Sequence, residues 1–81
     1  MKASSVQCIL YHTAGCHLCD EARKVIAQIP EITIKEAEIG NDPQLVERYG
    51  TRIPVLLLSD SGLTLDWPFT RKAIVQWAQL T

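Results

Sequence analysis

The stretch that organises this chain is Ala14-Gly15-Cys16-His17-Leu18-Cys19-Asp20-Glu21. It joins an apolar run before it to a helical pattern after it. Two cysteines separated by two residues at such a junction indicate redox or metal chemistry. We therefore interpret the rest of the chain as the scaffold that holds these two thiols, together with a docking surface beside them.

Length and composition point to one small domain. The chain has 81 residues, of which 47% are hydrophobic, so we expect a single domain over residues 1–81. Its longest apolar runs, such as Pro54-Val55-Leu56-Leu57-Leu58, fall far short of the roughly 20 residues that a membrane-spanning helix needs. The N-terminal residues lead into strand-like sequence without the apolar region of a secretory signal. We expect a soluble, cytoplasmic protein that does not associate with membranes.

Charge and cysteine content indicate which partners and which use of the cysteines to expect. Eight basic and nine acidic side chains give a net charge of −1, and both signs are scattered along the chain. Nucleic acid is therefore not an expected partner. Three cysteines in a chain without a secretion signal do not form a paired disulfide framework, because one is always left over. Catalytic, redox or metal use of the cysteines is the better interpretation.

The first half of the chain predicts a strand, a loop and a helix. Residues 6–11 are almost entirely apolar and read as a central strand buried on both faces. Gly15 then suits a loop conformation that other residues resist. A helix is predicted after the loop, with Pro30 ending it. Its apolar face is formed by Leu18, Ala22, Val25, Ile26 and Ile29, which recur at the helical spacing.

The second half supplies three more strands and two more helices. Residues 32–37 read as a strand, and Asp42 and Pro43 begin a short helix that Gly50 ends. Strands 55–58 and 63–66 form a predicted hairpin around Asp60-Ser61-Gly62. Thr70 caps a last helix whose apolar face contains Ile74, Trp77 and Ala78, and we expect the preceding Trp67-Pro68-Phe69 cluster to pack over the core.

These elements predict an α/β fold. Their order is strand, helix, strand, helix, strand, strand, helix. The opening strand-helix-strand unit requires two parallel strands, and the hairpin adds antiparallel pairing. We therefore expect a four-stranded mixed sheet flanked by three helices.

The two cysteines of the opening stretch receive different roles. Cys16 lies just before the helix, where unpaired backbone N–H groups favour a thiolate, so Cys16 is the predicted nucleophile. Cys19 lies about one turn further on and is the predicted resolving thiol. His17, if protonated, would favour the thiolate further, and Asp20 and Glu21 would oppose it. His17 is therefore a candidate for tuning the pKa of Cys16. The alternative is that His17 is a solvent-exposed residue without a role at the site.

Two other uses of the cysteine pair remain open. A tetrahedral zinc site needs four ligands, and beyond the pair only Cys8, His12 and His17 offer soft donors, so a metal-binding domain is the less favoured alternative. Cys8 itself lies inside an apolar strand and is expected to be a small buried hydrophobe. The remaining alternative is a non-catalytic redox-sensing or binding domain whose pair toggles between two states.

Two motifs resemble known redox proteins. Residues 11–19, Tyr11-His12-Thr13-Ala14-Gly15-Cys16-His17-Leu18-Cys19, resemble the strand-loop-helix of glutaredoxins. Thr51-Arg52-Ile53-Pro54-Val55 resembles the segment that carries the cis-proline of the thioredoxin superfamily. The resemblance covers roughly residues 6–80 and implies a thioredoxin/glutaredoxin-like fold and a thiol-disulfide oxidoreductase.

The resemblance also implies site residues. Cys16 would attack and Cys19 resolve, and Thr51, Arg52, Ile53 and Pro54 would bind substrate. The Ile53–Pro54 bond would be cis, which leaves the backbone of Ile53 beside the thiols and free to pair with an extended substrate.

The chain departs from glutaredoxins at several positions. Glutaredoxins usually have a basic residue at the position of Thr13, a proline and an aromatic residue at His17 and Leu18, and a Gly-Gly-Asp-like turn at residues 60–63. Those positions normally help to bind glutathione. Arg52 could supply a substitute contact for carboxylates, with a solvated arginine as the alternative.

The expected partners follow from these departures. Residues 49–54 also resemble thioredoxins, so a protein disulfide is a credible substrate. We expect a monomer that holds no bound cofactor and acts on a disulfide-containing protein or a low-molecular-weight thiol. Glutathione is a candidate co-substrate.

Overall fold

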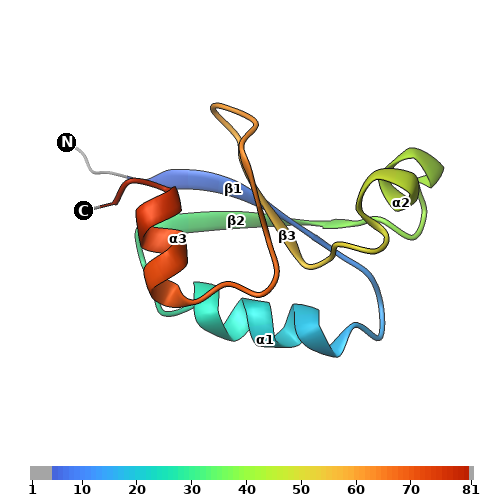
Figure 1. Ribbon diagram of the computed structural model, residues 1–81, viewed down its shortest axis with the longest axis horizontal. Coiled ribbons are helices and arrows are strands. Elements are labelled where there is room, and N and C mark those ends of the chain that lie inside the picture. Colours follow the sequence, from blue (N-terminus) through green and yellow to red (C-terminus); the bar gives the residue numbers. More distant parts are fainter. Residues whose placement is uncertain (1–4, 81) are drawn as a thin grey trace.

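A four-stranded mixed sheet forms the centre of the computed structural model, which describes residues 5–80 (Figure 1). The strand order is β2-β1-β3-β4, with β1 parallel to β2 and antiparallel to β3, and β3 antiparallel to β4. The predicted fold and order of elements are confirmed. In chain order these are β1 (Val6–His12), α1 (His17–Ile26), β2 (Ile32–Glu38), α2 (Pro43–Tyr49), β3 (Val55–Leu58), β4 (Thr64–Asp66) and α3 (Arg71–Trp77).

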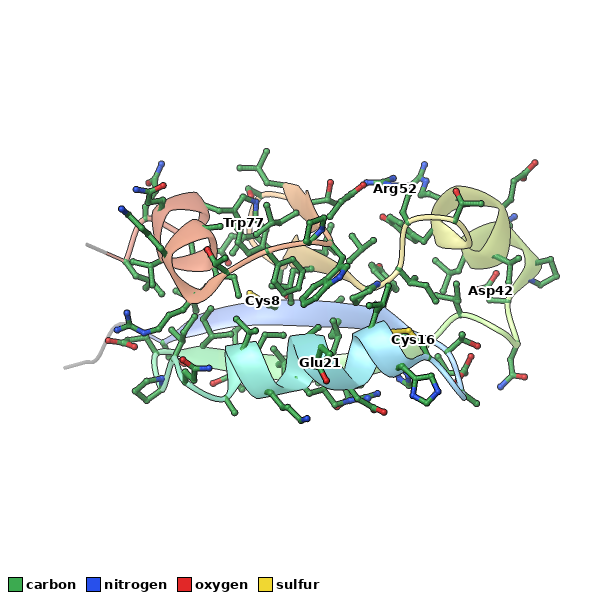
Figure 2. All side chains as sticks on the ribbon, turned by 60° about the horizontal axis from the view of Figure 1, so that its bottom comes forward. Cys8, Cys16, Glu21, Asp42, Arg52 and Trp77 are labelled. Atoms are coloured by element: carbon green, nitrogen blue, oxygen red, sulfur yellow. A yellow bond between two sulfur atoms is a disulfide. The ribbon has the colours of Figure 1, made fainter. Side chains whose placement is uncertain are left out.

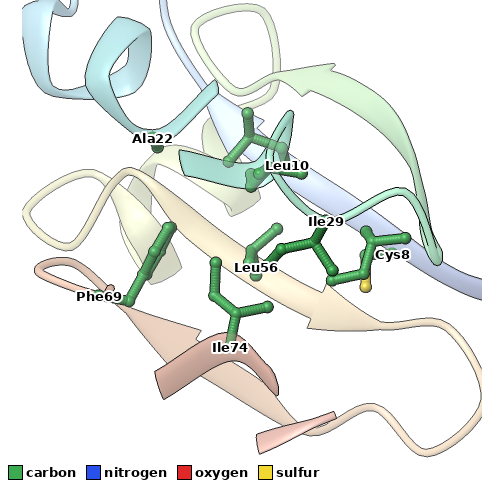
Figure 3. Packing of buried hydrophobic residues seen from close by; sticks show 9 residues of the cluster. Cys8, Leu10, Ala22, Ile29, Leu56, Phe69 and Ile74 are labelled. Carbon is green, nitrogen blue, oxygen red and sulfur yellow. The ribbon is translucent and has the colours of Figure 1, made fainter. Parts of the chain in front are cut away.

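One face of β1 carries the main core. Cys8 and Leu10 are buried on this face, and Leu10 pairs with the equally buried Leu56 of β3. Helices α1 and α3 add Ala22 and Ile74 to the same cluster (Figure 3). The other face is only partly covered, because α2 lies at one end of the sheet (Figure 1). The expectation that β1 is buried on both faces is therefore wrong for the second face, where Gln7 is exposed.

The cluster before α3 packs onto the core. Phe69 is buried, and its ring meets that of Trp67 edge to face with 4.9 Å between centroids. Trp67 is half-buried against the main cluster, as expected. The Trp67–Pro68 peptide bond is cis.

Helix α1 ends earlier than the apolar spacing predicts. It stops at Ile26, and the N–H groups of Gln28 and Ile29 donate to carbonyls three residues back, at 3.1 and 3.0 Å. Pro30 disfavours helical backbone at the residue before it, so the last turn tightens instead of continuing. Ile29 still reaches the core, from a turn rather than from the helix.

The other helices begin as the sequence indicates. The Asp42 carboxylate accepts hydrogen bonds from two N–H groups of α2, and the Thr70 hydroxyl accepts one from α3. Gly50 ends α2 with right-handed backbone (φ −55°), so the reason for glycine is space: a Cβ there would collide with the carbonyl oxygen of Val46. Among residues 5–80, no helix combines the length and apolar character needed to cross a membrane.

An ion-pair network ties α1 to β2. Arg23 donates through Nε and Nη2 to Glu36 at 3.0 and 2.8 Å, and through Nη1 to Asp20 at 2.7 Å. Hydrogen bonds from Arg23 lower the pKa of the Glu36 carboxyl below its ordinary value of 4.5. His12 Nε2 lies 3.4 Å from the same carboxylate, so Glu36 of β2 contacts both α1 and β1.

We predict that Leu56→Ala destabilises the fold by about 2–5 kcal/mol, because it opens a cavity in a fully buried part of the sheet. Urea unfolding measures the free energy. Leu63→Ala is the matched control, since Leu63 is 57% exposed and its loss should change the free energy by no more than about 0.5 kcal/mol. Equal losses in the two variants would contradict this view of the core.

The Glu36 network predicts a pH-dependent contribution to stability. A carboxyl whose pKa is lowered in the folded state stabilises that state at pH values above the ordinary pKa of 4.5. This stabilisation is lost as the pH falls through the lowered pKa. Glu36→Gln should therefore lower the free energy of unfolding at pH 7, and the deficit should shrink progressively below pH 4.5. Urea titrations of both proteins across this range test the expectation. A deficit that grows on acidification would refute it.

Candidate active site

The two predicted thiols meet at the start of α1 (Figure 2). Cys16 and Cys19 form a disulfide, with their Cα atoms 5.2 Å apart. The Cys16 sulfur also caps the helix, accepting the Cys19 N–H at 3.0 Å. Cys16 is half-buried whereas Cys19 is 0% exposed, so the Cys16 sulfur is the one that a molecule in solution can reach.

The loop before the helix presents Cys16 through local backbone geometry. Gly15 has φ +78°, the left-handed conformation that L residues rarely adopt. The N–H of Cys16 then donates to the carbonyl of Thr13 at 3.3 Å, and the carbonyl of Cys16 accepts the N–H of Asp20 at 3.3 Å. A tight turn therefore passes directly into the first turn of α1.

A carboxylate lies against this loop. The Thr13 hydroxyl donates to Glu38 Oε2 at 2.7 Å, and the Gly40 N–H donates to the same oxygen at 2.7 Å. The bond from Thr13, followed by that from Gly40, lowers the pKa of Glu38. Glu38 is thus ionised at neutral pH. It accepts the hydrogen bond of the Thr13 hydroxyl, which is the only side-chain donor of that residue.

The second wall of the site is the segment before β3. Residues 50–54 lie alongside the N-terminal end of α1 (Figures 1 and 2). The Ile53–Pro54 bond is cis, and Pro54 is fully buried. The Ile53 N–H donates to the carbonyl of Tyr49 at 3.0 Å, so the expectation of a free Ile53 backbone is wrong for the N–H. Within the part of the chain that is described, the Ile53 carbonyl accepts no backbone hydrogen bond.

Arg52 is held in a fixed orientation. Its Nε and Nη2 donate to the two oxygens of Asp66 at 2.8 and 2.7 Å, and its guanidinium carbon lies 5.1 Å from the centre of the Tyr49 ring. The hydrogen bonds from Arg52 lower the pKa of Asp66. The alternative expectation, that Arg52 is freely solvated, is therefore wrong. Thr51, beside it, is exposed.

An aromatic stack joins the two walls of the site. The rings of Tyr11 and Tyr49 lie 4.4 Å apart between centroids and 17° from parallel. Tyr11 precedes the cysteine loop, and Tyr49 precedes the 50–54 segment. Both pack with Ile39 and Val55 in a second, smaller core. This stack fixes the two loops relative to one another and to the end of the sheet.

The remaining candidate residues lie as follows. His17 is exposed as the first residue of α1, and Leu18 beside it is 50% exposed. Cys8 is 2% exposed, and burial raises the pKa of its thiol to about 11. Cys8 lies on β1, well away from Cys16 (Figure 2). Among residues 5–80, no three His, Cys, Asp or Glu side chains gather as a metal site would require.

The sequence motifs assign no individual role to Glu38, Tyr49 or Asp66. These three residues reach the site only through pairing and packing. The strand register places Asp66 opposite Val55, next to the 50–54 segment. That register brings Asp66 to the start of β3, close to Arg52, but the contact itself depends on how the 50–54 segment folds.

Comparison with known proteins agrees with this geometry. Residues 7–79 match the family model described as "Glutaredoxin-like domain (DUF836)". The X-ray structure of Northeast Structural Genomics target protein XcR50 from X. campestris is 35% identical, with a TM-score of 0.83, and the match covers 91% of this chain and 97% of that one.

The solution structure of the same target has 35% identity, a TM-score of 0.80 and coverage of 91% and 94%. Among curated proteins, none matches. Because the family model spans nearly the whole chain and the fold is shared, the chain belongs to the glutaredoxin-like family of the thioredoxin superfamily.

Proposed function

We propose that this protein is a thiol-disulfide oxidoreductase. The observation that carries the proposal is the position of the cysteine pair: the Cys16 sulfur caps α1 and is partly exposed, and Cys19 lies buried within bonding distance. A capping N–H and the positive end of a helix stabilise a thiolate, which is the reactive form of cysteine. This arrangement supports Cys16 as the attacking thiol and Cys19 as the resolving thiol.

The reaction transfers two electrons to a substrate disulfide. In the reduced protein, the Cys16 thiolate attacks one substrate sulfur, forming a mixed disulfide and releasing the other substrate sulfur as a thiolate. Cys19 loses its proton to solvent and attacks the Cys16 sulfur. The Cys16–Cys19 disulfide forms, and the second half of the substrate leaves as a thiolate. The dithiol is oxidised, and the substrate disulfide is reduced to two thiols.

The segment before β3 is proposed to hold the substrate. The Ile53 carbonyl can accept a hydrogen bond from an extended chain, whereas its N–H is already used by Tyr49. The exposed Leu18 offers apolar contact beside Cys16. The proposed substrates are a disulfide-containing protein or a low-molecular-weight disulfide.

The catalytic cycle closes with an external reductant. We propose that two external thiols reduce the Cys16–Cys19 disulfide again and leave joined as a disulfide, and that the cycle runs in the cytoplasm, where thiols are kept reduced. The protein itself need hold no cofactor for this chemistry, because both electrons come from its own dithiol.

We predict that Cys16→Ser abolishes reduction of a model disulfide, because an unactivated serine hydroxyl is too weak a nucleophile to attack a disulfide at neutral pH. Cys19→Ser should retain the first attack and accumulate a mixed disulfide on Cys16, detectable by intact mass. Cys8→Ser is the control, since Cys8 is buried away from the pair. Full activity in Cys16→Ser would refute the mechanism. A wild-type disulfide that forms readily but never turns over would favour a redox-sensing domain instead.

The capping contact also predicts the order in which the thiols react. In the reduced protein, iodoacetamide should modify Cys16 first, and at a lower pH than it modifies free cysteine. Cys8 should stay unmodified up to pH 9, because burial raises its pKa to about 11. Peptide mass mapping across a pH series measures this order. Faster labelling of Cys19 than of Cys16 would contradict the assignment of the nucleophile.

A further inference from the structure

We propose that Asp66 sets the substrate class of the site: by occupying Arg52, it makes the protein favour disulfides without carboxylates over polyanionic ones such as glutathione disulfide. This inference rests on the proposed function and deepens it. Asp66 thereby acts as an internal substitute for a substrate carboxylate.

The contacts of Arg52 leave few free hydrogen-bond donors for a ligand. A guanidinium binds carboxylates best through two parallel hydrogen bonds, and the Nε and Nη2 edge of Arg52 already makes that pair with Asp66. Nη2 also lies 3.5 Å from the Thr64 hydroxyl, and Tyr49 covers one face of the group. An incoming carboxylate therefore meets a neutralised ion pair rather than a free cation.

The backbone keeps Asp66 in place. Asp66 pairs with Val55 in the sheet, and the neighbouring Trp67 N–H donates to the carbonyl of Pro54 at 3.1 Å. An intramolecular partner held this way competes like a ligand at millimolar concentration or above. A carboxylate from solution must displace it to reach Arg52.

The opposite wall repeats the arrangement. Thr13 donates its hydroxyl to Glu38, so the side-chain donor on this wall is also taken by an internal carboxylate. Both acids have lowered pKa values and are ionised at neutral pH. The side chains of Arg52 and Asp66 are both partly exposed, so a disulfide in solution can approach the ion pair. Arg52 neutralises the charge of Asp66, whereas Glu38 is held by two uncharged donors, the Thr13 hydroxyl and the Gly40 N–H. The negative charge of Glu38 against the loop before Cys16 therefore disfavours an anionic substrate and favours a neutral or cationic one.

The test measures how fast the reduced protein is oxidised by disulfides of different charge. The probes are glutathione disulfide, bis(2-hydroxyethyl) disulfide and cystamine, which are anionic, neutral and cationic. Each rate constant is divided by that for dithiothreitol with the same probe, which removes the intrinsic reactivity of the disulfide. The expected order is cystamine fastest and glutathione disulfide slowest, with differences that shrink at high salt. Equal normalised rates, or a preference for glutathione disulfide, would overturn the inference.

Variants then assign the effect to one ion pair. Asp66→Asn should raise the rate ratio of glutathione disulfide to the neutral probe about fivefold, since it frees the charge of Arg52. Asp60→Asn is the matched control, because it removes the same charge from the hairpin turn and should leave the ratio unchanged. Combining Asp66→Asn with Arg52→Gln should cancel the gain.

The outcomes separate this inference from the proposed function. No reaction with any probe would refute the oxidoreductase itself. Normal reaction with a ratio that is unchanged in Asp66→Asn, or a gain that survives the loss of Arg52, would refute only the role of Asp66. Thermal unfolding of each variant verifies that the fold is intact, and the wild-type charge series tests the inference without any substitution.

Discussion

The contact on which the site depends is the hydrogen bond from the Cys19 N–H to the Cys16 sulfur. It caps α1, a role that serine, threonine, aspartate or asparagine more often fills. The same bond holds the sulfur where an anion is most stable. One interaction therefore starts the helix and positions the sulfur that we propose as the nucleophile. The rest of the fold brings the 50–54 segment up to this point.

That second wall depends on aromatic packing. The stacked rings of Tyr11 and Tyr49 connect the strand that leads into the cysteine loop with the helix that leads into the 50–54 segment. Aromatic stacking adds stability beyond the burial of area and constrains orientation, so it fixes two loops that are far apart in sequence. Helix α2 lies at the end of the sheet, where it can supply this contact, rather than covering the sheet's second face (Figure 1).

The charged and polar side chains around the site are engaged with one another. Arg52 pairs with Asp66, Thr13 with Glu38, and Arg23 with Glu36. Each pair spans two elements and so contributes to the shape of the site, yet each also removes a donor from the set available to a ligand. The departures of this chain from glutaredoxins at the loop positions are thus accompanied by internal partners that use the remaining donors.

The sequence by itself determined the order of the elements and the place of the cysteine pair. The apolar periods, the caps Asp42 and Thr70, the left-handed Gly15 and the spacing of Cys16 and Cys19 are local features, and local sterics and hydrogen bonding decide them. The tertiary structure decided which groups surround the thiols. Asp66 reaches Arg52 through strand register, Glu38 reaches Thr13 across the ends of β1 and β2, and the Ile53 N–H turns inward to Tyr49. These contacts join residues distant in sequence, or depend on how a loop packs, so only the assembled sheet and its packed helices could fix them.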